Sequence, residues 1–299
     1  MKTNHPLLDR QTEVEVVDDS HEPWLLVRCK ETDFHFIANP PKYDRLTQEF
    51  AWEKTHDEER ARRNREEPVM AMASTVAKKI KFLVRPNRDK MFALAKQVLA
   101  AQASRSYRVL DVGCGNGHKF ASFCERFRAS GVDIVPIGIE VSAYLASESR
   151  SRFAAFDGEV IENNAIDGMA SVESGSLDMV TMHSFLEHEA QPLPLLKTIR
   201  DALKPGGTVI LKVPNYACWN RVLRGSRWPG FRFPDHVSYF TPATLQLLAD
   251  QAGFRLLRQH LSDRLPTNDN MYAVLQPVGY ASSLPSSGFP QGSSRMPQG

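Results

Sequence analysis

The sequence lacks the features that mark secreted, disulfide-linked and membrane-spanning proteins. Its four cysteines, Cys29, Cys114, Cys124 and Cys218, lie far apart and form no CxxC pair, which favours a reducing compartment. No apolar run approaches the roughly 18 residues that a transmembrane helix needs, and the first residues contain no apolar signal segment. We therefore predict a cytoplasmic protein that does not enter the membrane.

The chain also lacks a strong excess of charge of either sign. Its 37 basic and 35 acidic residues give a net charge of +2, which argues against a dedicated nucleic-acid binder. The Arg- and Glu-rich run at 58–67 mixes both signs and indicates a solvated helix face rather than a nucleic-acid arm. With 42% hydrophobic residues, the 299-residue chain has enough apolar material for a sizeable core.

Composition divides the chain into an N-terminal accessory region, a helical linker, an α/β domain and a polar tail. The accessory region covers residues 1–70, where the first 23 residues are expected to be loose and residues 24–37 alternate as in a short hairpin. Residues 71–104 predict helices interrupted near Pro86. Residues 277–299 are rich in Pro, Gly and Ser and predict a disordered tail.

Residues 105–276 alternate short apolar strands with helical stretches, which is the pattern of a parallel α/β sheet. Strands are predicted at 107–112, 134–139, 158–162, 177–183, 207–213, 254–260 and 270–276. Helices are predicted at 117–129, 142–153, 192–203 and 242–252. The fold class is therefore α/β, with a mostly parallel seven-stranded sheet and helices on both faces.

The strongest local signal is the stretch VLDVGCGNG at 109–117, where an apolar strand runs into a loop with Gly113, Gly115 and Gly117. Glycine lets the backbone turn sharply and lets a ligand approach closely, as a nucleoside cofactor at a strand end requires. The spacing is GxGxG and not the dinucleotide fingerprint GxGxxG, because position 118 is histidine. At the end of the next strand, Glu140 can accept hydrogen bonds from both ribose hydroxyls.

Four stretches taken together resemble the class I S-adenosylmethionine (SAM)-dependent methyltransferases. They are VLDVGCGNG, IGIEVS at 137–142, SGSLDMVTMHSFLEH at 174–188 and LKPGGTVILKVPN at 203–215. Residues 235–242, before a helix that ends at Ala252-Gly253-Phe254, resemble the ubiquinone-biosynthesis-like small-molecule subgroup. The resemblance covers residues 105–276 and implies a Rossmann-like fold, SAM as cofactor and methyl transfer to a small molecule.

The resemblance also implies roles for individual residues. On this basis, Glu140 binds the ribose, Val141 packs on the adenine face, and Asn164 and Ala165 contact adenine. His183 and Ser184 are expected beside the transferable methyl group. The methionine and ribose region is expected to contact Asp111, Gly113, Cys114, Gly115 and Gly117.

The sulfonium methyl of SAM is already electrophilic, so the protein has mainly to position the acceptor. An oxygen acceptor also benefits from a base near neutral pH, for which histidine is the usual choice. His183, His188 and His236 are the candidate catalytic residues, and each has the alternative of a purely structural role.

Residues 215–240 combine arginines with aromatic residues and predict a lid over the acceptor. Arginine suits an anionic group and aromatic faces suit rings, so the lid predicts an anionic, partly apolar or sugar-like acceptor. The alternative is a surface loop that packs on the sheet through its aromatics. The predicted acceptor contacts are Arg224, Arg227, Trp228 and Tyr239.

No metal is predicted. The stretch from Cys29 to Thr32 resembles the start of a zinc ribbon, but threonine replaces the second cysteine and no further CxxC follows. Tetrahedral zinc needs four ligands, so Cys29 is expected to be a buried small residue.

Three rival functions share parts of this pattern. They are a nicotinamide-dependent dehydrogenase or epimerase, a methyltransferase acting on RNA or another macromolecule, and a non-catalytic binding protein on the same fold. The preferred prediction is methyl transfer to a small-molecule acceptor such as a saccharide hydroxyl. The acceptor atom and the oligomeric state stay open at this point, because fold does not fix function.

Overall fold

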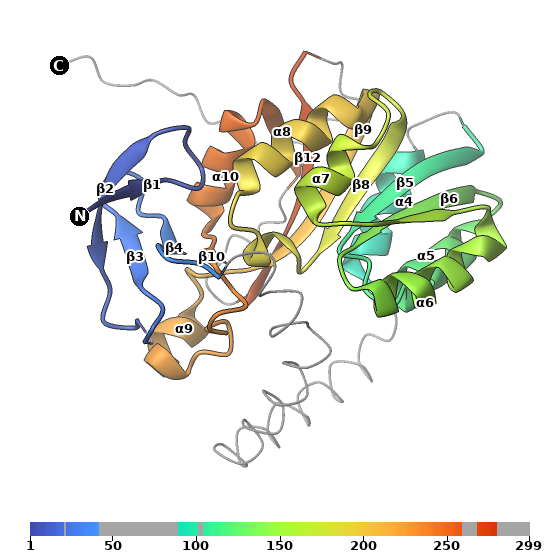
Figure 1. Ribbon diagram of the computed structural model, residues 1–299. Coiled ribbons are helices and arrows are strands. Elements are labelled where there is room, and N and C mark those ends of the chain that lie inside the picture. Colours follow the sequence, from blue (N-terminus) through green and yellow to red (C-terminus); the bar gives the residue numbers. More distant parts are fainter. Residues whose placement is uncertain (21, 42–88, 101–103, 259–267, 280–299) are drawn as a thin grey trace.

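The computed structural model describes residues 1–20, 22–41, 89–100, 104–258 and 268–279. These residues form a seven-stranded sheet with helices around it and a smaller five-stranded sheet beside it (Figure 1). Within the described ranges, no helix combines the length and apolar character needed to cross a bilayer. The predicted run at 58–67 and most of the helical linker lie outside these ranges.

The large sheet has the strand order β11-β12-β9-β8-β5-β6-β7. The strands from β9 to β7 run parallel, while β12 and β11 are antiparallel to their neighbours, which confirms the predicted Rossmann-like sheet. The bounds are β5 Ser106–Val112, β6 Asp133–Glu140, β7 Glu159–Glu162, β8 Leu177–His183, β9 Leu203–Pro214, β11 Phe254–Arg258 and β12 Asn270–Pro277.

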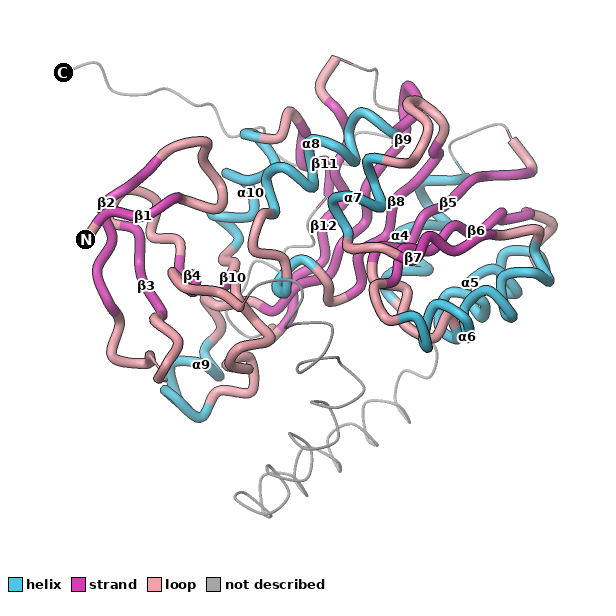
Figure 2. The backbone as a smooth tube through the Cα atoms, in the orientation of Figure 1, coloured by secondary structure: helices cyan, strands magenta, loops and turns pink. Residues whose placement is uncertain are grey.

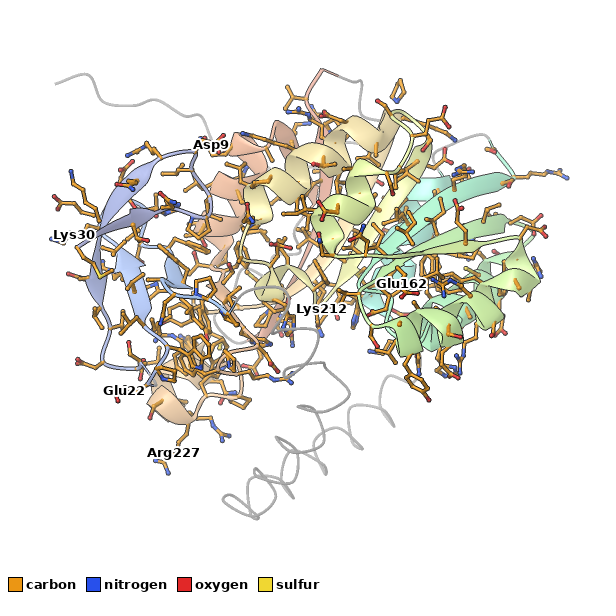
Figure 3. The ribbon with its side chains drawn as sticks, in the orientation of Figure 1. Asp9, Glu22, Lys30, Glu162, Lys212 and Arg227 are labelled. Atoms are coloured by element: carbon orange, nitrogen blue, oxygen red, sulfur yellow. The ribbon has the colours of Figure 1, made fainter. Side chains whose placement is uncertain are left out.

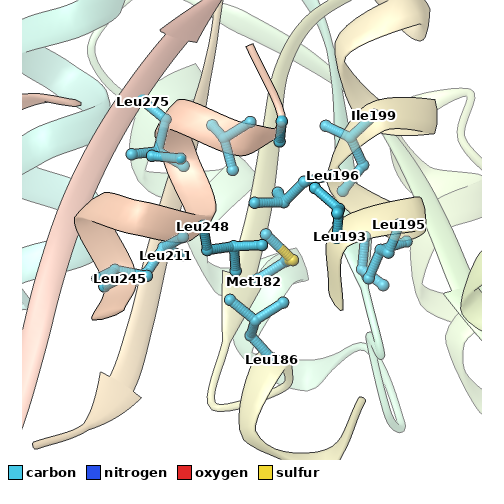
Figure 4. Close-up of a cluster of buried hydrophobic side chains, with 14 of the residues drawn as sticks. Met182, Leu186, Leu193, Leu195, Leu196, Ile199, Leu211, Leu245, Leu248 and Leu275 are labelled. Carbon is cyan, nitrogen blue, oxygen red and sulfur yellow. The ribbon is translucent and has the colours of Figure 1, made fainter. Parts of the chain in front are cut away.

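Helices cover both faces of this sheet because alternate strand residues point to opposite sides. Val109, Met179 and Ile210 pack with α4, α5 and α6 on one face. Leu110 and Val180, one residue further along their strands, pack with α7, α8 and α10 on the other face (Figures 2 and 4). The helix bounds are α4 Lys90–Ala100, α5 His118–Arg128, α6 Ala143–Phe153, α7 Ala165–Ala170, α8 Pro192–Ala202 and α10 Pro242–Gln251.

Most differences from the predicted elements concern short segments. Helix α7, helix α9 (Trp219–Arg224) and strand β10 (Ser238–Tyr239) were not predicted, since two to six residues carry too little periodicity. The stretch Lys204–Gly207, between the predicted helix at 192–203 and the predicted strand at 207–213, lies inside β9. The pairing register shifts there: Leu177 pairs with Leu203, but Met179 pairs with Thr208. Extra residues on β9 are thus accommodated as a bulge.

The prediction that residues 1–23 are loose is wrong. Strands β1 (Lys2–Asn4) and β2 (Gln11–Val16) lie there and pair with each other. Thr12 and Val14 alternate inward along β2, while the polar residues between them face solvent and conceal the pattern in the composition. The predicted hairpin at 24–37 is confirmed as β3 (Leu26–Cys29) and β4 (His35–Ile37).

The five-stranded sheet has the order β1-β2-β3-β4-β10, so its last strand comes from the lid segment 215–240. Ser238 pairs with Phe36 and Tyr239 pairs with His35. Cys29 is fully buried, as predicted, and Thr32 accepts or donates a 2.9 Å hydrogen bond with Nε2 of His5. Strands β1 to β4 are therefore joined to the lid through β10.

Phe240 joins the small sheet to the α/β domain. Its ring is 1% exposed and lies 5.3 Å from the Phe34 ring, centroid to centroid. Both rings belong to the same buried cluster as Leu245 and Leu248 of α10. One continuous core therefore serves both sheets.

We expect Phe240→Ala to lower the free energy of unfolding by about 3–5 kcal/mol, because it leaves a cavity between the two sheets. Urea unfolding followed by circular dichroism measures the loss. The exposed aromatic Tyr144, with 69% of its surface accessible, supplies the control variant Tyr144→Ala, which should change stability little. Equal losses in both variants would contradict a shared core at Phe240.

Candidate functional site

The candidate site lies where the carboxyl ends of β5, β6 and β8 meet. Strand β5 lies between β6 and β8, so the strand order reverses there, and open α/β sheets bind ligands at such a point. Asp111 on β5 pairs with Gly138 of β6 and Thr181 of β8. The glycine loop follows the end of β5, Glu140 is the last residue of β6 and His183 is the last residue of β8. They therefore share one edge of the sheet.

The glycine loop has positive φ angles at all three glycines, which suits glycine above other residues. A Cβ at Gly113 would collide with the Phe185 ring, and one at Gly117 would lie 2.7 Å from Oγ of Ser149. A Cβ at Gly115, where φ is +58°, would meet no atom within 4 Å. The backbone at Gly115 is therefore bare toward open space, as close ligand contact requires.

Cys114 has a packing role in the same loop. Its Sγ faces Gly138, where a Cβ would lie 2.6 Å from the sulfur, and it contacts Oγ of Ser149 at 3.6 Å. Burial raises the pKa of the thiol to about 12. The thiol is thus protonated at neutral pH and poorly suited to act as a nucleophile.

Glu140 is 8% exposed, and backbone N–H groups fix the direction of its carboxylate. The Gly115 N–H donates to Oε2 at 2.9 Å and the Ser142 N–H donates to Oε1 at 3.0 Å. Each oxygen has a second lone pair, which a ribose hydroxyl could use. Next to it, Val141 is 44% exposed and presents an apolar surface of the kind that packs on an aromatic ring.

Asn164 and Ala165 lie in the loop after β7, at the start of α7. Asn164 caps this helix: Oδ1 accepts from the Asp167 N–H at 3.0 Å, and Nδ2 donates to Oδ2 of Asp167 at 2.6 Å. Ala165 is buried, and the Asn163 N–H donates to the Glu140 carbonyl at 3.1 Å. The loop is therefore held beside Glu140, and its contact with adenine stays a prediction.

Asp111 accepts a 2.7 Å hydrogen bond from Oγ1 of Thr181. Burial raises its pKa to about 7, while the Thr181 hydrogen bond and Lys119 lower it and Glu140 raises it further. The carboxyl group therefore changes charge close to neutral pH.

His183 ends β8 and pairs with Lys212 of β9. Desolvation, together with repulsion from Lys212 and Lys119, lowers the pKa of His183 to about 4, so the imidazole is neutral at pH 7. The next residue, Ser184, has a φ of +59°, and its Oγ accepts a 2.9 Å hydrogen bond from Nζ of Lys212. Figure 3 labels Lys212 near the centre of the molecule.

A cavity of about 300 Å³ begins at Ser184 and extends under the lid segment. It brings together four residues predicted from the sequence, namely Ser184, His188, Trp228 and His236. Sequence reasoning missed Glu187 and Arg232, although both lie in motifs that it had singled out. The lining residues are Ser184, Glu187, His188, Pro214, Trp228, Pro229, Gly230, Arg232, His236, Asp269 and Asn270.

Backbone carbonyls orient both histidines of this cavity. Nδ1 of His188 donates to the Asp235 carbonyl at 2.8 Å, and Nδ1 of His236 donates to the Gly230 carbonyl at 2.8 Å. A carbonyl only accepts, so Nδ1 carries the proton and Nε2 carries the lone pair in each neutral ring. The two ring centroids are 4.7 Å apart and the rings lie edge to face.

Glu187 is 2% exposed, and its Oε2 has no hydrogen-bond partner among the described residues. Burial raises its pKa to about 7, against the effects of Lys212 and Arg232, which lower it. Burial also lowers the pKa of His188 to about 4, and Arg232 adds to this effect. A buried carboxyl group therefore lies beside a His188 ring that is neutral at pH 7.

The other residues that were predicted to contact the acceptor differ in how far they are buried. Trp228 and Tyr239 are each 3% exposed and belong to an aromatic cluster that packs the lid against the small sheet. Arg227 is exposed and Arg224 is half-buried, and neither lines the cavity; Figure 3 shows Arg227 at the outer end of the α9 segment. The cavity therefore contains Trp228 and neither of the two arginines.

We expect Asp111→Asn to stabilise the protein above pH 7. The raised pKa means that the folded state binds more protons than the unfolded state between pH 4 and 7, so stability falls as pH rises through this window. The variant removes this loss, a gain of up to about 4 kcal/mol at pH 8 that vanishes near pH 4. Urea unfolding at both pH values measures it, and an equal difference at the two would refute the raised pKa.

Comparison with known proteins places this site in a family. A family model for the methyltransferase domain matches residues 71–259, more than half of the chain. The ubiquinone biosynthesis O-methyltransferase of Idiomarina loihiensis is 35% identical over 109 residues, which are 36% of this chain and 42% of that protein. Its counterpart from Xanthomonas axonopodis pv. citri is 27% identical over 186 residues, 56% of this chain and 75% of that one.

This chain thus spans a little under half the length of the first relatives that it matches. A solved structure of an S-adenosylmethionine-dependent methyltransferase from Clostridium acetobutylicum superposes with a TM-score of 0.49 at 11% identity, covering 69% of this chain and 99% of that one. The matched residues include the glycine loop and Glu140, which form this edge of the sheet. The chain belongs to the methyltransferase domain family.

Proposed function

We propose that this chain is a SAM-dependent methyltransferase that methylates a hydroxyl group of a small, polar acceptor. The main support for the proposal is that a bare turn with a fixed carboxylate lies next to a polar cavity. The bare turn at Gly115 and the fixed carboxylate of Glu140 lie at one edge of the sheet, and the polar cavity begins one residue beyond His183. A donor and an acceptor would meet at His183.

The residues at the sheet edge fit SAM. Glu140 would accept the ribose hydroxyls, Val141 would pack on the adenine, and the loop from Gly113 to Gly117 would lie along the sugar and the methionine portion. Asp111 would add a negative charge near the cationic part of the cofactor. When bound, SAM supplies an activated methyl group, so this chain has to bind, orient and deprotonate.

The cavity suits a saccharide or a similar polyol. Trp228 and Pro229 offer apolar surface for a ring, while Arg232, Asp269 and Asn270 offer hydrogen bonds around it. Nε of Arg232 is buried without a hydrogen-bond partner among the described residues. Such a group is costly unless a ligand or water pairs with it, which supports a polar occupant.

The reaction then needs only a few steps from the protein. The acceptor oxygen loses its proton, attacks the methyl carbon as the S–C bond breaks, and leaves a methyl ether and S-adenosylhomocysteine. Glu187, His188 and His236 lie where they can draw off the hydroxyl proton or polarise the O–H bond. His183, neutral at pH 7, would position the acceptor beside the methyl group.

Gly115→Ala should weaken SAM binding at least tenfold by isothermal titration calorimetry, because the new methyl group would occupy the space where the cofactor rests. Gly131→Ala is a matched control: its φ is +79°, and a Cβ there also meets no atom within 4 Å. Both changes strain the backbone similarly, so stability should fall equally. Equal SAM affinity in the two variants would argue against the proposed cofactor site.

Acceptor contacts can be separated from cofactor contacts with a panel of glycosides and phenols, with S-adenosylhomocysteine release as the readout. With the acceptor so found, Trp228→Ala should raise KM at least fivefold and leave the Kd for SAM unchanged. The double change Arg224→Ala and Arg227→Ala should alter KM less than twofold, because neither side chain lines the cavity. Methylation of phenols alone would reject the saccharide acceptor but keep methyl transfer.

A further inference from the structure

We propose that Glu187, His188 and His236 bind a single divalent transition-metal cation at the wall of the acceptor cavity. One carboxylate oxygen and one nitrogen from each ring lie within 4.8 Å of one another, and all three residues line the cavity. Two histidines and one glutamate are a ligand set that zinc uses where one coordination position stays open to substrate. Binding of the metal does not depend on the proposed methyl transfer, whereas its catalytic use does.

The geometry needs only a small contraction. Ligand atoms at about 2.0–2.2 Å from a tetrahedral cation are roughly 3.4 Å apart, so rotations of the side chains would close the present spacing. Glu187 and His188 are on the turn after β8, which is Leu186–His188, while His236 is on the lid. The Val237 N–H donates to the Glu187 carbonyl at 2.8 Å and holds the two segments together.

The hydrogen bonds around the cluster leave ligand atoms directed toward a shared point. Both histidines use Nδ1–H on a backbone carbonyl, so each presents a lone pair at Nε2. Oε2 of Glu187 is likewise an acceptor and has no hydrogen-bond partner among the described residues. A carboxylate oxygen of Glu187 and one nitrogen of each ring therefore lie close enough together to share one cation.

The Nδ1 contacts are also those expected around a metal. Ligating histidines usually donate their second ring N–H to a carbonyl or carboxylate, which fixes the ring and strengthens the ligand. Here the Asp235 carbonyl fixes His188, and the Asp235 carboxylate pairs with Arg232 at 3.2 Å. Of the nearby cations, Lys212 is bonded to Ser184 and Arg232 to Asp235, and no ion pair of Glu187 is found within the described part of the chain.

The metal would activate the acceptor directly. A hydroxyl bound at the open coordination position loses its proton more readily, because the cation stabilises the alkoxide. The proton leaves to solvent, the alkoxide oxygen forms the new bond to the methyl carbon, and the S–C bond breaks. No oxidant or reductant is needed, and one proton is released in each turnover.

This site differs from the expectation of no metal, which rested on the missing cysteines of the N-terminal region. The ligands here come from two motifs, at 187–188 and 236, that are far apart along the chain. Spacing rules for metal sites detect ligands that are close in sequence, and only the packing of the lid brings these three together.

The test uses the full chain, stripped of metal with a chelator and titrated with Co²⁺ and Zn²⁺. We expect one equivalent to bind, with visible absorption bands of Co²⁺ in a low-coordinate N/O site and a higher melting temperature. Glu187→Gln and His236→Gln should each weaken Co²⁺ binding at least tenfold while leaving the circular dichroism unchanged. His118→Ala, which removes an exposed histidine outside the cluster, should bind Co²⁺ like the parent.

Two results would overturn the metal site: Co²⁺ affinity that is equal in the parent and in both glutamine variants, or binding without the absorption bands. SAM titrations on the metal-free protein keep the two proposals apart. Normal SAM affinity without metal binding rejects the metal site alone. Metal binding without SAM affinity rejects the proposed function alone.

Discussion

Hydrogen bonds from the glycine loop to the end of β6 connect the two halves of the proposed cofactor edge. The Gly115 N–H donates to the carboxylate of Glu140, so the loop after β5 and the tip of β6 are locked together. Any larger residue at Gly113 or Gly117 would push this loop out of place, since both positions are enclosed by neighbouring side chains. The parallel pairing of β5 with β6 sets the register that allows the contact, and the reversal of strand order beside β5 opens the edge to a ligand.

The acceptor side is built differently. One wall is the turn Leu186–His188, which follows β8 of the large sheet. The other wall comes from the lid, whose strand β10 pairs with β4 of the small sheet. Buried aromatic residues around Trp228 and Tyr239 then fill the space between lid and small sheet. The polar cavity thus lies between the two sheets, which explains why buried titratable groups gather there.

The positions of the residues at the proposed cofactor edge were largely predictable from the sequence, and those around the proposed acceptor cavity were not. Gly113, Gly115, Gly117 and Glu140 follow strands with strong apolar patterns, so their position at a shared edge comes from the strands alone. Hydrogen bonds around this cavity join residues more than 40 positions apart in the sequence, such as His188 and Asp235. The polar residues that alternate along β2 also made its buried face hard to recognise from composition. Arg224 and Arg227 were chosen for charge, but charge does not tell which face of a short helix meets the cavity.

The pairing of β10 with β4 has a consequence for how such a protein diversifies. The lid wall of the proposed acceptor cavity is anchored to the small sheet, whereas the glycine loop and Glu140 belong to the large sheet. Substitutions in strands β1 to β4 can therefore shift the lid and the shape of that cavity, while the glycine loop and Glu140 keep their positions. Strands β4 and β10, about 200 residues apart in the sequence, thus form one unit that sets the position of the lid.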